Sequence, residues 1–157
     1  MWIGYHGAMT DHEQLPAGDP WRRPEGVDDA TVEAVGRVTE ALEWVERARG
    51  DLYELHQKMG HADLLFGEAA DALEDAGHQA WADRIRRDVM GRNVIEGRWT
   101  FQIVEEFDAG YYEPVRDVER DLSAELTGGV RHLFEAEMKQ GRRTKGHPAH
   151  TSRPGDT

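Results

Sequence analysis

Residues 28–77 read DDATVEAVGRVTEALEWVERARGDLYELHQKMGHADLLFGEAADALEDAG, the longest stretch of regular apolar spacing in the chain. Its apolar residues recur at steps of three and four, which is typical of an amphipathic helix. Asp28 or Asp29 can cap the start of this helix, and Gly77 suits its end. Because Gly50 is a weak position, the stretch predicts one long helix, or two if it breaks there. The apolar positions are Val35, Val38, Leu42, Val45, Ala48, Leu52, Leu55, Met59, Ala62, Phe66, Ala69 and Leu73.

The rest of the chain predicts two more helices. The periodicity continues over residues 79–108, and the segment DAGYYEP at 108–114 then predicts a turn. Pro114 suits the first turn of a third helix, which Gly128 and Gly129 are expected to kink or open to a close neighbour. Short connections make consecutive helices antiparallel neighbours. We therefore predict an all-α, up-down antiparallel bundle of three long helices, or four if the first breaks near Gly50, with no β-sheet.

Two segments of different composition flank this predicted bundle domain, residues 27–139. Residues 1–26 place Gly, Pro and Asp at close spacing without periodicity, which predicts an irregular arm. Met9 within this arm is an alternative start to Met1. Residues 140–157 hold four basic side chains against one acidic side chain and predict a disordered basic tail.

The composition excludes several kinds of chemistry. The chain has no cysteine, which rules out disulfides, thiolate metal sites and cysteine nucleophiles. No run approaches the roughly 18 apolar residues of a membrane helix, so we expect a cytoplasmic protein without a membrane span. The formal net charge of −12 repels nucleic acid and argues against DNA or RNA as a partner. Dinucleotide, P-loop, zinc and kinase motifs are absent from the sequence, so no cofactor is expected.

A charged pair falls on the apolar face of the expected second helix. Arg92 and Glu96 are four residues apart and project into the stripe of apolar side chains on that helix. Burying either charge alone is costly, whereas a hydrogen-bonded pair is tolerated. Counting both ways from turns at Gly77 and Gly110 brings residues of the first and third helices to the same level. The candidate buried polar site is Arg92, Glu96, His56 and Asp63, with Glu125 and His132 at its edge.

Three interpretations of this site remain open. The first is a structural ion-pair network that fixes how the helices pair. The second is a metal or ligand site of His56, Asp63, Glu96 and Glu125, although the Glu-x-x-His spacing of di-iron bundles is absent and an arginine would repel a cation. The third is an acid–base or anion pocket, in which Arg92 holds a carboxylate or phosphate and His56 or Glu96 moves protons.

A second apolar set lies on the other side of the expected second helix. A helix that is apolar on two sides is either central in a bundle or covered by a partner. We therefore expect a homodimer or a partner protein, and a non-enzymatic function through protein–protein contacts. The alternative is a small-molecule- or metal-binding bundle, either a binding protein or an enzyme, that uses the buried polar site. The candidate interaction surface comprises Trp44, Met90, Val94, Phe101 and Val104.

Overall fold

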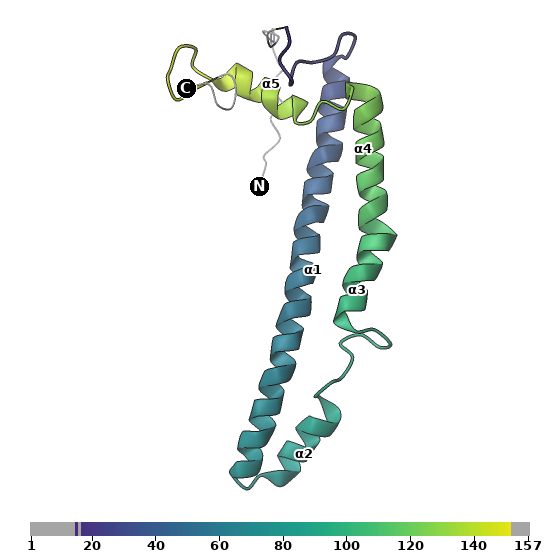
Figure 1. Cartoon of the computed structure of the whole chain (residues 1–157), viewed down its shortest axis with the longest axis vertical. Helices are drawn as coiled ribbons and strands as arrows, with labels where there is room; N and C mark the ends of the chain where they lie inside the picture. The colour runs from purple at the N-terminus through teal and green to yellow at the C-terminus, as the bar shows by residue number, and fades with distance from the viewer. Residues whose placement is uncertain (1–14, 16, 152–157) are drawn as a thin grey trace. The chain divides into compact units, whose positions relative to one another are not determined.

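The computed structural model describes residue 15 and residues 17–151 of the chain. This described part consists of helices and connecting turns without any strand, which confirms the predicted all-α fold. Predictions for the start of the chain, including Met9, and for residues 152–157 lie outside the described residues. The elements in order are α1 (Asp29–Asp75), α2 (Gln79–Asp88), α3 (Thr100–Phe107), the π-helix η1 (Asp108–Tyr112), α4 (Glu113–Thr127) and α5 (Leu133–Arg142), as labelled in Figure 1.

The long helix α1 runs through Gly50 without a break, which is the first of the two predicted alternatives. It begins where the Asp28 carboxylate accepts the Thr31 N–H at 2.8 Å, so Asp28 acts as the N-cap. It ends at Gly77, whose φ of 85° lies in the left-handed region that glycine adopts without strain. There the N–H groups of Gly77 and His78 close back onto carbonyls of the last turn, as in a Schellman motif.

The prediction of one continuous second helix over residues 79–108 is wrong, because the chain is not helical in the middle of this range. Helix α2 ends at Asp88, and residues 89–99 form an irregular connection before α3 begins. Two glycines explain the break, because Gly91 and Gly97 have φ of 67° and 73° and so leave the helical region. An isolated bridge between Ile95 and Arg98 closes the turn around Gly97. The two glycines, six residues apart, therefore predict the helix break better than the apolar periodicity predicts a continuous helix.

The predicted turn at residues 108–114 is also wrong, because the chain stays helical there. Helices α3, η1 and α4 follow one another without interruption (Figure 1). Pro114 has no N–H to donate to the fourth carbonyl before it, and its ring crowds that carbonyl in an α-helix. The preceding turn widens instead, with the Glu113 N–H donating to the Asp108 carbonyl. This π turn absorbs the proline within a continuing helix.

The described chain divides into two compact units, and the predicted domain 27–139 spans both. In the unit formed by the segment up to Glu40 and the segment from Val118, α4 ends at Gly128 and Gly129, both with positive φ. The pair therefore ends the third helix and does not merely kink it. Helix α5 follows and packs close to α1, since a Cβ on Gly36 would meet the Phe134 Cβ at 3.1 Å.

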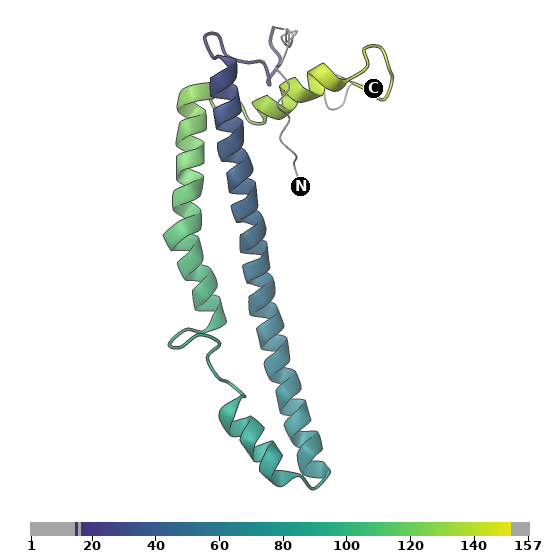
Figure 2. The same cartoon turned by 180° about the vertical axis from the view of Figure 1, so that it is seen from behind.

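The other unit, Ala41–Asp117, is an antiparallel helical hairpin. Helix α2, and then α3 with η1, return alongside the part of α1 within this unit, as the two opposite views in Figures 1 and 2 agree. Ala70 of α1 and Ala82 of α2 are fully buried where these helices meet. Arg86 of α2 bridges to Asp71 and Glu74 of α1, each at 2.6 Å. Within the described residues, no helix is both long and apolar enough to cross a membrane.

Candidate functional site

The structure does not bury the charged pair at the centre of the predicted polar site. Arg92 and Glu96 both lie in the irregular connection 89–99 and are exposed. The hydrogen bond recorded for the Arg92 side chain goes to the Asp88 carbonyl at 3.4 Å. The prediction that this pair occupies an apolar helix face is therefore wrong, because the breaks at Gly91 and Gly97 remove both residues from any helix.

Two of the predicted site residues do connect the hairpin, although through other partners. His56 Nδ1 lies 2.8 Å from the Thr100 hydroxyl at the start of α3. The Asp63 carboxylate accepts the backbone N–H of Gly91 at 2.8 Å. Both side chains are half-buried on the side of α1 that faces the returning chain. They hold the two ends of the irregular connection to α1, which is a structural role.

The remaining predicted site residues, Glu125 and His132, are exposed and belong to the other unit. His132 precedes α5 with a φ of 58°, a left-handed conformation that few non-glycine residues adopt. Among residues 15 and 17–151, no three His, Cys, Asp or Glu side chains converge in a way that could hold a metal ion. The alternative metal set of His56, Asp63, Glu96 and Glu125 is thus not assembled within the described chain.

Sequence reasoning missed a polar network around the π turn. Arg49 of α1 donates from Nε and Nη2 to the two Asp108 carboxylate oxygens at 2.7 and 2.8 Å. Its guanidinium lies over the rings of Tyr53 and Tyr112, at 5.0 and 4.7 Å from their centroids. The Tyr112 hydroxyl donates to Glu46 of α1 at 2.6 Å. The network ties α1 to η1 at the one turn where the helix geometry changes.

This network is electrostatically self-contained. The Arg49 guanidinium beside Asp108 lowers the pKa of that carboxyl, while the same pair raises the pKa of Arg49. The hydrogen bond to Glu46, reinforced by burial, raises the pKa of Tyr112. Arg49 and Asp108 are stabilised in their charged forms, as in a structural ion pair, and Tyr112 is stabilised as the neutral phenol that donates to Glu46. Finding it from the sequence would have required knowing that residues 108–112 stay helical.

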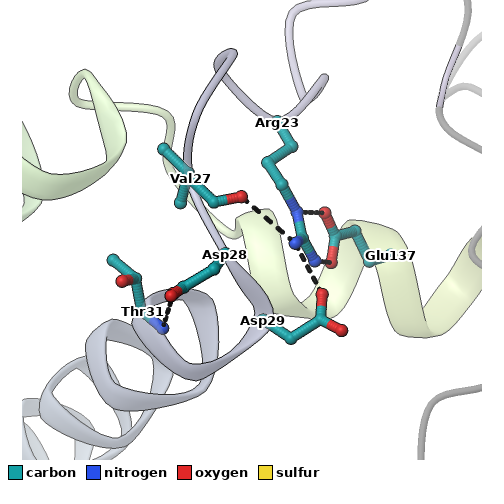
Figure 3. A network of polar contacts seen from close by, with 6 residues as sticks. All are labelled: Arg23, Val27, Asp28, Asp29, Thr31 and Glu137. Atoms are coloured by element: carbon teal, nitrogen blue, oxygen red, sulfur yellow. Dashed lines mark hydrogen bonds and ion pairs between the residues drawn. The ribbon is translucent and has the colours of Figure 1, made fainter.

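A second polar network joins the start of the described chain to α5. Figure 3 shows the Arg23 guanidinium between Glu137 of α5 and Asp29 at the start of α1. Arg23 donates to both Glu137 carboxylate oxygens at 2.7 Å and to Asp29 at 2.6 Å. Glu137 is buried, with 9% of its surface exposed. A buried carboxylate with a two-bonded arginine partner fixes the docking of α5 and is fully occupied in doing so.

The candidate interaction surface is only partly exposed. Trp44, Val94 and Phe101 are exposed. Val104 is buried, however, and Met90 is half-buried with its terminal methyl 3.4 Å from where a Cβ on Gly67 would lie. Val104 therefore belongs to the interior of the hairpin, so its assignment to a surface is wrong, whereas Met90 remains partly exposed.

Other large apolar side chains of the hairpin unit are exposed as well. On α1 these include Leu55, Leu64 and Phe66, and Trp81 of α2 is 57% exposed. Single exposed apolar residues are ordinary, whereas a large contiguous apolar patch is unusual on the surface of a monomer. The complete exposed set in this unit is Trp44, Tyr53, Leu55, Leu64, Leu65, Phe66, Trp81, Val94, Ile95, Trp99, Phe101 and Tyr111.

Comparisons with protein-family models, with curated proteins and with solved structures find no match to this chain.

Proposed function

We propose that this chain is a self-associating helical protein, which works by protein–protein contact rather than by catalysis. The observation that carries the proposal is the exposed apolar surface of the hairpin unit. Its buried apolar side chains are Ala70, Ala82, Val104 and Tyr112, whereas twelve large apolar side chains, Trp44 and Trp81 among them, are exposed. The returning arm of the hairpin leaves large apolar side chains of α1 exposed, and association with another helical chain would cover them.

The polar groups of the described chain support the same proposal. Arg49 pairs with Asp108, and Arg23 pairs with Glu137. Side chains that are already hydrogen-bonded in pairs are poorly placed to polarise a substrate or to bind an anion. The large exposed side chains of the hairpin unit are apolar, and the removal of apolar surface from water drives association.

The test is the mass of the full chain in solution, measured by light scattering over a range of concentrations. We expect a mass of twice one chain or more that falls towards one chain on dilution. Thermal unfolding should then shift to higher temperature as concentration rises, because association stabilises the folded state by mass action. A mass of one chain at every concentration, with a melting temperature independent of concentration, would contradict the proposal.

A further inference from the structure

Three exposed apolar side chains of α1 form a regular stripe. Trp44, Leu55 and Phe66 are spaced eleven residues apart, and they are 54%, 39% and 42% exposed. Eleven residues make about three helical turns, so each member is rotated only about 20° from the previous one. Because α1 is unbroken here, the three side chains point in one direction along its surface.

The stripe lies beside the hairpin contact and not within it. His56 and Asp63, which reach the returning chain, lie about 80–100° around the helix from Leu55. A helix in a four-helix bundle contacts two neighbours on adjacent sides, about a quarter turn apart. Helix α1 therefore has one neighbour position filled by its own chain, and the stripe marks the next position.

The sequence around the stripe is symmetric in size about Leu55. Trp44 and Phe66 stand eleven residues to either side of it, and Ala48 and Ala62 stand seven residues to either side. In an antiparallel pair of α1 helices centred on Leu55, each Trp44 would lie opposite Phe66 of the second copy. Each Ala48 would lie opposite Ala62 of the second copy, which leaves room for the large rings beside them.

The charges along this stretch suit the same arrangement. Between residues 44 and 66 there are four acidic and three basic side chains, so the overlap is nearly neutral although the whole chain carries −12. In the antiparallel pair, Lys58, which forms an exposed ion pair with Glu54 of its own chain, would lie level with residue 52 of the second copy and within reach of its Asp51 as a second partner. A parallel pair in register would set Lys58 beside Lys58, which repels.

We infer that Trp44, Leu55 and Phe66 form the contact with a second copy of this chain, with the two α1 helices antiparallel and centred on Leu55. The inference rests on the proposed self-association and adds its surface, partner and register. Two hairpins joined in this way would place four helical segments around a shared apolar interior.

Disulfide cross-linking tests the register directly, because the natural chain has no cysteine. Leu55→Cys alone should give a covalent dimer under mild oxidation, since the two residues meet at the two-fold axis. Trp44→Cys and Phe66→Cys should cross-link when the two variants are mixed, but neither should cross-link with itself. Self-cross-linking of Trp44→Cys would indicate a parallel pair and overturn the inferred register while leaving self-association intact.

A matched pair of charge substitutions tests the surface. Leu64 is 68% exposed and lies about half a turn around α1 from Leu55, so Leu64→Glu places the same charge on the opposite side. We expect Leu55→Glu to reduce the mass to that of one chain, and Leu64→Glu to leave it unchanged. Circular dichroism of both variants separates dissociation from unfolding.

The outcomes distinguish the inference from the proposed function. If Leu55→Glu remains associated like Leu64→Glu, the contact lies elsewhere and the inferred surface is wrong, although self-association stands. If Leu64→Glu alone dissociates, the contact lies on the opposite side of α1, and the inferred surface is again wrong. If the unmodified chain has the mass of one chain at every concentration, both the inference and the proposed function fail.

Discussion

Arg49 and Asp108 form a two-bonded ion pair between α1 and the π turn, with Nε–Oδ1 at 2.7 Å and Nη2–Oδ2 at 2.8 Å. Asp108 is the first residue of η1, and its carbonyl also accepts the Glu113 N–H that defines the widened turn. The side chain and the main chain of one residue therefore hold the same turn, the first to α1 and the second to α4. This explains why the helix continues through Pro114 at this level of α1.

Replacing Asp108 by Asn should lower the stability of the hairpin unit in a pH-dependent way. Arg49 holds the pKa of the Asp108 carboxyl below its ordinary value of 3.8. A lowered pKa contributes stability that is fully present above the ordinary value and is lost as the pH falls through the lowered one. Urea unfolding from neutral to acidic pH should show the natural chain more stable than Asp108→Asn at neutral pH and the two converging in acid. A constant difference at all pH values would contradict a role for the ionised carboxylate.

Alanine substitutions at three glycines, two within α1 and one at its C-terminal end, should change the free energy of unfolding in different directions. Gly50 has open space around it, so Gly50→Ala should raise the free energy of unfolding by about 1 kcal/mol through helix propensity. At Gly36 the new methyl would meet Phe134 at 3.1 Å, and we expect a net loss of roughly 1 kcal/mol. Gly77→Ala should lower stability by about 1 kcal/mol because its φ is 85°. Chemical denaturation of the three variants measures this series, and a stabilising Gly36→Ala would show that α5 does not pack there.

Substitution of the exposed pair should have little effect on stability. Arg92→Met, Glu96→Leu and the double change should each alter the free energy of unfolding by no more than about 0.5 kcal/mol. Asp63→Ala should cost about 1 kcal/mol, since it removes the acceptor for the Gly91 N–H. A double-mutant cycle by urea unfolding decides between these expectations and a buried pair. If each single change caused a large loss of unfolding free energy and the double change recovered it, the prediction of a buried Arg92–Glu96 pair would be supported instead.

Removing the arginine that docks α5 should destabilise the unit that contains α5. Arg23→Met leaves the Glu137 carboxylate buried without its two-bonded partner, which should cost roughly 2 kcal/mol. Arg37→Met is the matched control, because its partner Glu33 and Arg37 itself are both more than half exposed, and such pairs contribute about 0–1 kcal/mol. Amide hydrogen exchange along α5 reports the difference. Equal protection of α5 in both variants would show that Arg23 does not hold it.

The helical class, the extent of α1 and the caps at its two ends follow from local features of the sequence. These features depend on local signals, namely amphipathic periodicity, an Asp before the first turn and a Gly after the last turn. Hydrogen bonds between residues close in sequence are sufficient to form the helix caps. The eleven-residue spacing of Trp44, Leu55 and Phe66 is likewise a property of the sequence, whereas their exposure is seen only in the structure.

The positions at which the second arm of the hairpin breaks and continues became clear from the folded structure. Gly91 and Gly97 end the helix although apolar residues stay in phase across them, because backbone conformation outweighs periodicity at two positive-φ residues. Pro114 stays within a helix because a π turn and the contacts of Asp108 and Tyr112 with α1 stabilise it. The predicted polar site failed for the same reason. Whether a charged side chain is buried depends on the helix and the turn that carry it. Because the prediction missed the break in the second helix, it placed Arg92 and Glu96 in the interior, whereas they lie on the surface.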